Sequence, residues 1–297
     1  MTWVAAVARL RARREPGVLV TVATVRGHAP RRAGAKLVVG RTETWGSIGG
    51  GNIEAVAVDR ARELIGAACA VPDSEPELME FALNDKVTSR HGVQCCGGAV
   101  TVLLEPLPVV QAVAIFGVGH VGLELARILA RHDLDLHLID TRRDMLTGER
   151  LGVLADAVAQ IEVHHTPLLP EAVLTELPAG THVLIMTHDH AEDAALCDAA
   201  LRTAGLGSIG LIGSAAKWAR FRQRLAAEGG HEAAAIDRIK TPIGMTGITG
   251  KEPATIAVSV AAALLQTFEQ DRDGPAPHTL AAVASVPNAP LTVAGRR

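Results

Sequence analysis

The sequence is poor in aromatic residues, poor in cysteine and free of long apolar runs, and each shortage excludes a class of protein. Aromatic residues make up 2% of the 297 residues and tyrosine is absent, so stacking platforms for single-stranded nucleic acid are not expected. The four cysteines are too few and too scattered for the disulfide framework of a small secreted protein. A net charge of −3 gives no electrostatic reason for nucleic-acid binding.

Signals for membranes and for export are missing as well. Glycine, proline or charge interrupts every apolar stretch before it reaches membrane-spanning length. The first residues, MTWVAAVARLRARREPG, carry their positive charges after the apolar positions, which is the reverse of a signal peptide. We therefore expect a cytoplasmic protein that binds neither membranes nor nucleic acid.

The clearest pattern that is present runs from Val113 to Asp140. It predicts a short apolar strand, a G-x-G-x-x-G turn, an apolar helix and a second strand that ends in an acid. Such glycines allow a tight bend, close approach of a pyrophosphate and close packing of helix on strand. The helix N-terminus attracts the phosphate, and the acid can accept a hydrogen bond from a ribose hydroxyl. The same turn can also serve only as a packing joint. The residues concerned are Gly117, Gly119, Gly122 and Asp140.

The length of the chain and the order of its patterns predict two domains and a tail. Residues 1–107 are expected to form a smaller α+β domain, with a linker at 106–108. Residues 108–270 are expected to form a Rossmann-like, doubly wound parallel sheet with a C-terminal helix. Residues 271–297, rich in proline and alanine, are expected to form a flexible tail. Further strands are predicted at 18–25, 36–39, 77–83, 99–104, 161–165, 181–186 and 208–212, and further helices at 2–13, 53–65, 167–178, 191–203, 215–228 and 253–270.

The first domain carries a glycine run before a helix. Gly49, Gly50 and Gly51 precede Asn52, a good N-cap, and their backbone N–H groups can face an anion. A flexible turn explains the run equally well. A second loop of the same domain gathers four cations, which fit either a solvated turn or an anion site. They are Arg26, Arg31, Arg32 and Lys36.

The most unusual chemistry is the adjacent pair Cys95 and Cys96, preceded by His91 and followed by two glycines. A disulfide between neighbours is strained. One exposed thiolate, a soft ligand for a metal or a carrier of sulfur, is the preferred interpretation. The alternative is a pair of small buried hydrophobic residues.

A third group of polar residues follows the strand predicted at 181–186. His188 and Asp189 belong to a Thr-His-Asp-His segment at the carboxyl end of that strand, where ligands bind in open parallel sheets. Acid–base or metal chemistry and simple capping of the next helix are both open. Arg142 and Arg143 can neutralise a phosphate beyond the ribose. The cations of the helix at 215–228 are expected to form a solvated face, including Lys217.

Taken together, seven blocks in a fixed order resemble the XdhC/CoxI family. The blocks are GHAPRRAGAKLVV, GSIGGGNIE, HGVQCCGG, FGVGHVG with IDTR, THDH, GLIGS-x-x-K and TPIGM. Members of this family are accessory proteins that mature xanthine dehydrogenase and related molybdenum hydroxylases. His28 and Asn52 depart from the residues that many relatives have at these positions.

The resemblance implies a chaperone that binds the molybdenum cofactor (molybdopterin), protects it during sulfuration and delivers it to the apo-hydroxylase. It also implies a cysteine desulfurase as sulfur donor and a homodimer. The cysteine loop, with Cys96 preferred, would supply the ligand to molybdenum. A carrier rather than an enzyme is therefore expected. The alternatives are an NAD(P)-dependent oxidoreductase, with Asp140 on the ribose and His188 as acid or base, and a nucleotide-sensing regulatory module.

Overall fold

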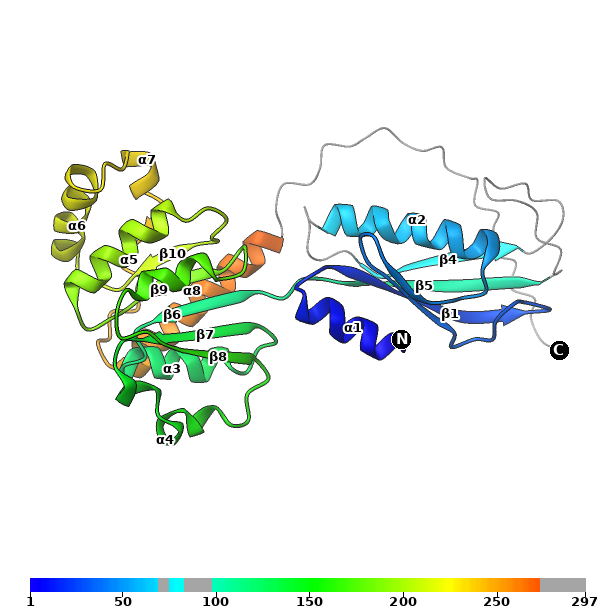
Figure 1. The fold of residues 1–297 in the computed structure, drawn as a ribbon, viewed down its shortest axis with the longest axis horizontal. Coiled ribbons are helices and arrows are strands. Elements are labelled where there is room, and N and C mark those ends of the chain that lie inside the picture. The colour runs from blue at the N-terminus through cyan, green and yellow to red at the C-terminus, as the bar shows by residue number, and fades with distance from the viewer. Residues whose placement is uncertain (69–74, 83–97, 273–297) are drawn as a thin grey trace.

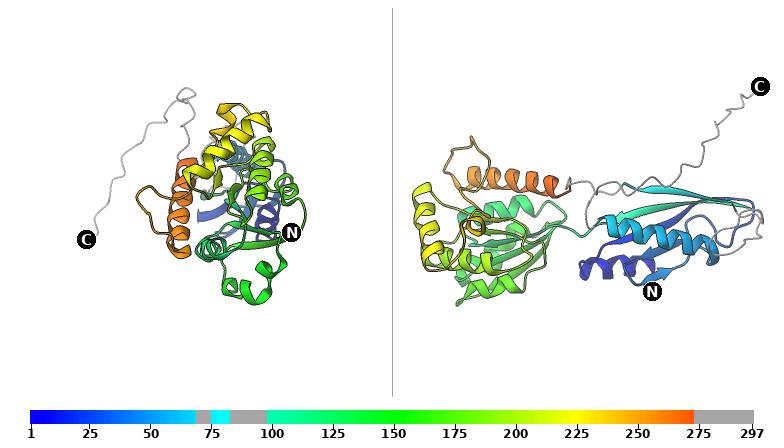
Figure 2. Two further views of the ribbon diagram at one scale, coloured as in Figure 1. Left: turned by 90° about the vertical axis from the view of Figure 1, so that its left-hand side faces the viewer. Right: turned by 90° about the horizontal axis from the view of Figure 1, so that it is seen from above.

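The computed structural model describes residues 1–68, 75–82 and 98–272, which form two domains arranged end to end (Figures 1 and 2). The pair Cys95–Cys96 lies outside the described residues, as does the tail expected at 271–297 apart from residues 271 and 272, which belong to the last helix. No helix among the described residues is long and apolar enough to cross a lipid bilayer.

The N-terminal domain is a five-stranded antiparallel sheet with the order β3-β2-β1-β5-β4. Alternation along β1 sends Val18, Val20 and Val22 into the core under α2, whereas Leu19 packs with α1 on the opposite face. The elements are α1 (Trp3–Ala12), β1 (Gly17–Arg26), β2 (Lys36–Val39), β3 (Thr44–Gly46), α2 (Gly51–Ala68), β4 (Glu77–Ala82) and β5 (Ala99–Leu107).

Two details of this domain differ from the sequence-based expectation. Asn52 does not cap α2, because the helix already begins at Gly51. The linker expected at 106–108 starts later, because β5 continues through Pro106, which pairs with Val18 of β1. The pairing of β5 with β4 ends at Leu104. Pro106, which has no N–H group, is therefore not required to donate a hydrogen bond to β4.

The C-terminal domain is a six-stranded parallel sheet with the order β11-β10-β9-β6-β7-β8. This is the doubly wound Rossmann order, and the predicted fold class is confirmed. The strands are β6 (Ala112–Phe116), β7 (Asp135–Asp140), β8 (Gln160–His165), β9 (His182–Ile185), β10 (Ile209–Leu211) and β11 (Ile239–Lys240).

Helices cover both faces of this sheet. Helices α3 and α8 pack on one face around Leu125, Leu129 and Leu264, and α5 and α6 pack on the other around Leu196 and Phe221. The helical elements are α3 (His120–Leu129), η1 (Arg143–Leu146), α4 (Gly148–Leu151), η2 (Gly152–Leu154), η3 (Pro170–Thr175), α5 (His190–Arg202), α6 (Ala215–Ala227), α7 (Ala233–Ile236) and α8 (Pro253–Arg272).

Most predicted elements are present with ends shifted by a few residues, and two are different in kind. Strand β11 lies in a stretch that the sequence predicts as loop, because two residues are too few to show an alternating pattern. The helix expected at 167–178 is the shorter 3₁₀ helix η3.

Ion pairs join the two domains. Arg11 of α1 contacts Asp133 at 3.0 Å and Asp135 at 3.2 Å, at the start of β7. Arg14 also pairs with Asp135 and donates to the Val110 carbonyl at 2.9 Å. A cavity of about 450 Å³ lies beside these contacts, between α1 and the β5–β6 linker. None of the predicted site residues in the described part of the chain lines it.

Candidate functional site

The glycine turn after β6 lies at the topological switch point of the parallel sheet, between β6 and β9. Gly117 has φ of +102°, and a Cβ there would overlap the Met186 backbone at the end of β9. A Cβ on Gly122 would overlap the Gly117 carbonyl, so both glycines are required for packing. Gly119 is different: its φ is −72°, and a Cβ would meet nothing nearer than Arg142 at 3.9 Å. The fold therefore does not require glycine at 119, whereas close approach of a ligand would.

Asp140, the acid that ends β7, is buried and holds the turn together. Its carboxylate accepts from the Val118 N–H at 2.8 Å and from the Arg142 N–H at 2.9 Å. The Arg142 guanidinium completes a two-pronged contact, in which Nε lies 3.0 Å from Oδ1 and Nη2 lies 3.0 Å from Oδ2. Burial alone would raise the pKa of Asp140, but these hydrogen bonds from Arg142 and Val118 lower it below its usual value. The carboxylate is thus ionised and already engaged by protein donors.

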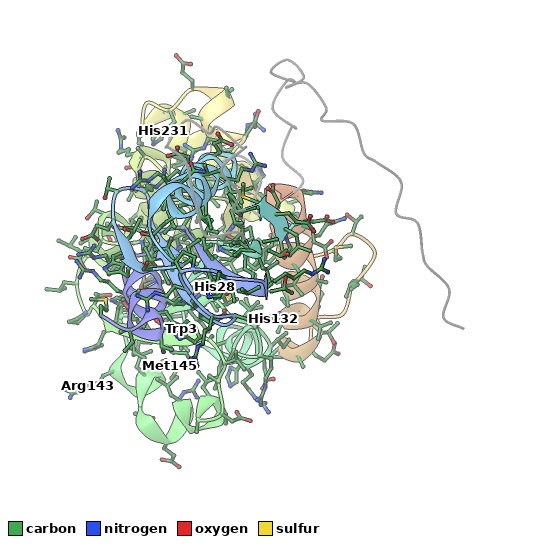
Figure 3. The ribbon with its side chains drawn as sticks, turned by 90° about the vertical axis from the view of Figure 1, so that its right-hand side faces the viewer. Trp3, His28, His132, Arg143, Met145 and His231 are labelled. Carbon is green, nitrogen blue, oxygen red and sulfur yellow. The ribbon has the colours of Figure 1, made fainter. Side chains whose placement is uncertain are left out.

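Arg142 consequently sits beside the helix N-terminus that follows the turn. Its guanidinium is tied to Asp140 on one side and lies against Gly119 on the other. Arg150 approaches the same turn and donates to the Val118 carbonyl at 3.2 Å. Its part in the site has no signal in the sequence, since no motif includes it. Arg143 is exposed and lies at the periphery of the molecule (Figure 3).

The Thr-His-Asp-His segment lies next to the turn, because Gly117 packs directly against Thr187. Asp189 caps α5 by accepting from the Ala191 N–H at 2.6 Å and the Glu192 N–H at 3.3 Å. These backbone donors lower the pKa of Asp189. The capping interpretation is confirmed for Asp189, and a role in binding stays a proposal. His188 is exposed at this edge.

A buried ion pair supports this segment from below. Lys217 of α6 pairs with Asp193 of α5, and it also donates to the Ile212 carbonyl at 3.1 Å. Asp193 in turn accepts from the Thr187 N–H at 3.1 Å and from its hydroxyl at 2.7 Å. The expectation that Lys217 lies on a solvated face is therefore wrong. The Lys217 side chain is only 9% exposed, because its ammonium reaches Asp193 and the Ile212 carbonyl near the end of β10.

The glycine run of the N-terminal domain binds its own carboxylate. Glu54 accepts from the Ile48 N–H and the Gly50 N–H, each at 3.0 Å, and from the Ser47 hydroxyl at 2.6 Å. The Gly49 N–H donates to the Ser47 hydroxyl at 3.1 Å. Burial raises the pKa of Glu54, but these hydrogen bonds outweigh it and lower the pKa overall. This carboxylate explains how α2 begins at Gly51 without Asn52 as cap, and it competes with any external anion.

Two predicted loops of the N-terminal domain, the glycine run and the cationic loop, come together at one end of its sheet. A Cβ on Gly49 would lie 2.9 Å from Pro30, so the glycine run packs on the cationic loop. Gly98, two residues after Cys96, lies against the carbonyls of Arg26 and His28. His28 is exposed at this end of the molecule, which faces the viewer in Figure 3. Arg26, Arg31 and Arg32 are exposed there, whereas Lys36 donates to Thr21 and lies over Trp3.

The predicted site residues that the structure describes fall into two groups at opposite ends of the chain's long axis, one at the start of α2 and one at the end of β6 (Figure 1). Strand β5 starts at Ala99, beside the glycine and cationic loops, and leads through the linker into β6, which ends at the Gly117 turn (Figure 1). The run from Ala99 to Phe116 spans up to about 55 Å at roughly 3.3 Å per residue. Within one chain, the structure does not bring Gly49–Gly51 and Gly117–Gly122 to one site.

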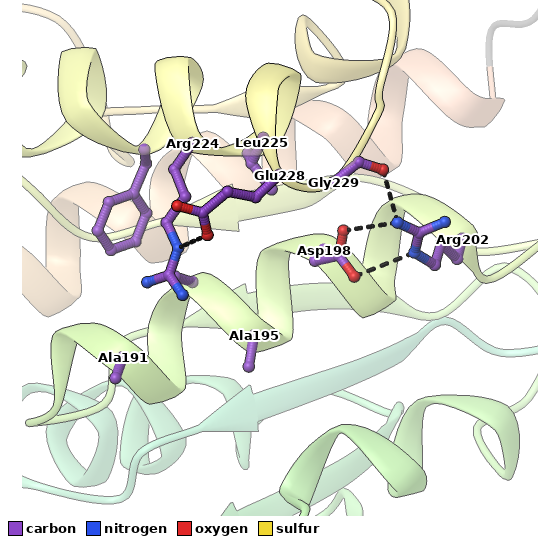
Figure 4. A pocket seen from close by; sticks show the side chains of 10 residues that line it. Ala191, Ala195, Asp198, Arg202, Arg224, Leu225, Glu228 and Gly229 are labelled. Atoms are coloured by element: carbon purple, nitrogen blue, oxygen red, sulfur yellow. Dashed lines mark hydrogen bonds and ion pairs between the residues drawn. The ribbon is translucent and has the colours of Figure 1, made fainter.

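A separate cavity of about 250 Å³ lies between α5 and α6 (Figure 4). Its charged side chains neutralise one another: Asp198 pairs with Arg202 at 3.0 Å, and Arg224 pairs with Glu228 at 2.7 Å. Cys197, buried nearby on α5, has its pKa raised to about 12 by that burial. This cavity therefore offers neither an uncompensated charge nor a thiolate.

Comparisons with known proteins agree with the two-domain arrangement. Residues 113–264 match the family described as the XdhC Rossmann domain, and residues 10–71 match the XdhC and CoxI family. An Escherichia coli (strain K12) protein described as uncharacterized protein YqeB is 25% identical over 263 residues. That match covers 87% of this chain but 45% of the relative, so the chain spans less than half the relative's length.

The solved structures that are similar to the chain include the following two. One is a Bacillus halodurans protein described as a xanthine dehydrogenase, 19% identical, with 91% of this chain and 96% of that chain covered and a TM-score of 0.44. The other is the Escherichia coli tRNA N6-threonylcarbamoyladenosine dehydratase, 17% identical, with 54% and 87% covered and a TM-score of 0.39.

Proposed function

We propose that this chain, which belongs to the XdhC and CoxI family, is an accessory protein that matures xanthine dehydrogenase or a related molybdenum hydroxylase. In this proposal it binds the molybdenum cofactor, protects it during sulfuration and delivers it to the apo-hydroxylase. The cofactor is cargo, bound and released, so the protein acts as a carrier rather than as a catalyst.

The observation that supports this function best is the arrangement of Arg142 beside Gly119. Molybdopterin ends in a phosphate, and a helix N-terminus with an adjacent guanidinium is a favourable place for a phosphate. Gly119 leaves the backbone open to that group, and Asp140 fixes the guanidinium in place. We place the cofactor's phosphate at this turn, with His188 and Asp189 at its edge.

The same geometry weighs against the rival function, an NAD(P)-dependent oxidoreductase. A nicotinamide dinucleotide needs the acid at the end of the second strand to accept from the adenosine ribose. Here both oxygens of Asp140 already accept from Val118 and Arg142. The ribose would have to displace Arg142 before it could bind.

We propose that Cys95 or Cys96 contacts the molybdenum and its sulfur ligands. A thiolate there would be a soft ligand for molybdenum, with Cys96 preferred. The exposed residues Arg26, Arg31 and Arg32 of the same domain would attract an anionic cofactor and an acidic surface of a partner. A cysteine desulfurase is the proposed sulfur donor.

A homodimer would bring together the two groups of site residues that lie at opposite ends of one chain. In a two-fold dimer of antiparallel protomers, the cysteine and glycine loops of one protomer would face the Gly117 turn of its partner. Each of the two resulting sites would then take residues from both copies, and the cofactor would be enclosed between them. The homodimer is thus part of the proposed site.

The decisive experiment is reconstitution. The protein should be purified from cells that make the cofactor, and its bound pterin measured by fluorescence and mass spectrometry. Loaded protein should restore the activity of apo xanthine dehydrogenase in a one-to-one ratio, because a carrier gives up its cargo once. Restoration by trace amounts, or turnover of NAD(P) with a small substrate by the protein alone, would contradict the proposal and favour an enzyme.

A further inference from the structure

Three side chains on neighbouring strands of the Rossmann domain form a cluster that the proposed function does not use. His137 lies on β7, and Glu162 and His164 lie on β8, the outermost strand on that side of the sheet. The parallel register places His137 opposite Glu162, and Glu162 and His164 are two residues apart. Alternation along a strand therefore puts all three side chains on one face of the sheet.

This cluster is separate from the phosphate-facing turn. His137 is three residues from Asp140, so the two side chains leave β7 on opposite faces. Leu136 and Leu138, its neighbours in the strand, pack in the core with α3 and α8, on the face that His137 does not share. Asp135 shares the face of His137, but its carboxylate pairs with Arg11 and Arg14.

The distances between the three side chains match those around a tetrahedral metal ion. His137 Nδ1 lies 3.2 Å from His164 Nε2 and 3.4 Å from Glu162 Oε2, and His164 Nε2 lies 3.8 Å from the same oxygen. Zinc–nitrogen bonds of about 2.0–2.1 Å at tetrahedral angles separate two ligand atoms by roughly 3.3–3.4 Å. An ion can therefore bind all three atoms with only small adjustments of the exposed glutamate.

The donor set and the exposure of the cluster point to an open site. Two imidazoles and one carboxylate are the protein ligands of many zinc sites that keep a fourth position for water or substrate. The exposed fraction rises from 7% for the His137 side chain to 23% for His164 and 68% for Glu162. An ion can thus reach the cluster from solvent, and its fourth position would face outward.

A direct hydrogen bond between the two rings is the simplest competing explanation. One imidazole can donate to the other across the 3.2 Å separation. Such a bond uses one nitrogen of each ring, yet it gives no reason for the Glu162 carboxylate to approach both of those nitrogens. Convergence of three ligand atoms on one point is what a metal ion would require.

We propose that His137, Glu162 and His164 form a binding site for one divalent transition-metal ion, with zinc the best match. The site ties the outermost strand β8 to β7, and it leaves one coordination position open to water or a small anion. It stands apart from the proposed cofactor site, so either proposal can fail without the other.

The test uses the full chain in a Cys95→Ser, Cys96→Ser background, so that thiolates do not compete for the metal. Zinc alone is titrated by calorimetry, and cobalt is used as a spectroscopic substitute. We expect one equivalent to bind, with a visible cobalt spectrum typical of nitrogen and oxygen ligands in four-coordinate geometry. Zinc should also raise the Tm, because an ion that binds only the folded state stabilises it.

Three variants separate this site from the other histidines, of which the chain has 12 in all. His164→Ala and Glu162→Gln should each raise the zinc Kd. Replacing a residue that only supports a metal ligand lowers metal affinity by roughly 10–100-fold, and His164→Ala should lower it by more than that. His165→Ala is the matched control, because that exposed histidine is adjacent in sequence but leaves β8 on the opposite face. It should bind zinc as the background protein does. Absence of binding, or equal affinity in all three variants, would overturn the proposal and leave a hydrogen-bonded histidine pair.

Discussion

The guanidinium of Arg142 and the carboxylate of Asp140 form a two-pronged contact, with two nitrogen–oxygen distances of 3.0 Å. The two residues are separated by one position, so the contact closes a short loop at the end of β7. It fixes a cation beside the glycine turn and at the same time occupies the acid that would otherwise bind a ribose. This pair is the reason that we propose a phosphate, rather than a nucleoside, at the turn.

The first prediction concerns what Asp140 does for stability. Asp140→Asn removes the charge that accepts from Val118 and Arg142, and hydrogen bonds to charged groups contribute about 1.5–3 kcal/mol each. We expect the free energy of unfolding at pH 7 to fall by roughly 2–3 kcal/mol, measured by urea denaturation. Asp144→Asn, an exposed neighbour, should change it by less than about 0.5 kcal/mol.

The effect of Asp140→Asn should depend on pH in one direction. The pKa of Asp140 is lowered in the folded state, so its contribution is fully present above the unfolded value of about 4. That contribution is lost as the pH falls through the lower, folded value. The difference between wild type and variant should therefore shrink below about pH 4. A difference that stays constant down to pH 3 would contradict this account.

The second prediction tests the role of Arg142 as an anion ligand. Arg142→Ala should weaken binding of the phosphorylated pterin by at least about tenfold, which corresponds to roughly 1.4 kcal/mol. Arg143→Ala removes the same charge from the next residue, but at an exposed position away from Gly119. It should have little effect on affinity measured by fluorescence titration. Equal losses in both variants would mean that only the net charge matters.

The third prediction concerns the buried pair beneath the strand ends. Lys217→Met leaves the Asp193 carboxylate buried without its cation, and breaking such a pair costs about 3–5 kcal/mol. Arg220→Met on the exposed face of the same helix should cost less than about 0.5 kcal/mol. Chemical denaturation of both variants measures the difference. A small loss in Lys217→Met would contradict this account and mean that water or another donor replaces the ammonium beside Asp193.

The Rossmann domain was predictable because its signals are local. The glycine turn, its flanking strands and the acid at the end of β7 lie within 28 residues, Val113 to Asp140, and each has a period or a spacing that identifies it. Strand β11 was not predictable, because Ile239–Lys240 is too short to alternate. Its place in the sheet is set by packing against β10, which no local pattern encodes.

The candidate site was predictable as a set of positions but not as a set of contacts. Gly119 and Asp140 could be identified from spacing, whereas the partner of Asp140 is Arg142, whose contact depends on a side-chain rotamer. Lys217 pairs with Asp193 across 24 residues, and the sequence pattern of α6 gives no sign of it. Glu54 likewise fills the glycine run from within the following helix. Side-chain contacts, local for Asp140 and Glu54 and distant for Lys217, therefore limit what sequence spacing can predict.

The last prediction tests whether one site takes residues from two copies of the chain. Two variants are each expected to be inactive in reconstitution: Gly119→Val, in which a side chain blocks the phosphate, and the double change Cys95→Ala, Cys96→Ala. In Gly119→Val the fold should stand, because φ of −72° suits any residue and the nearest atom from elsewhere in the fold, on Arg142, lies 3.9 Å from the new Cβ. Circular dichroism and the Tm check that both variants are folded.

Mixing the two variants, after mild denaturation and refolding to exchange subunits, distinguishes the two arrangements. If each site joins the cysteine loop of one protomer to the turn of its partner, a mixed dimer has one site with both defects and one site with none. One of the two sites in each mixed dimer is then intact. Random exchange makes half of all dimers mixed, so one quarter of all sites are intact. Cofactor binding and reconstitution should therefore return to roughly one quarter of wild type. If each site lies within one chain, every site in the mixture keeps one defect and activity stays absent. Recovery of activity therefore establishes a shared site, and its absence from a mixture shown to contain mixed dimers excludes one.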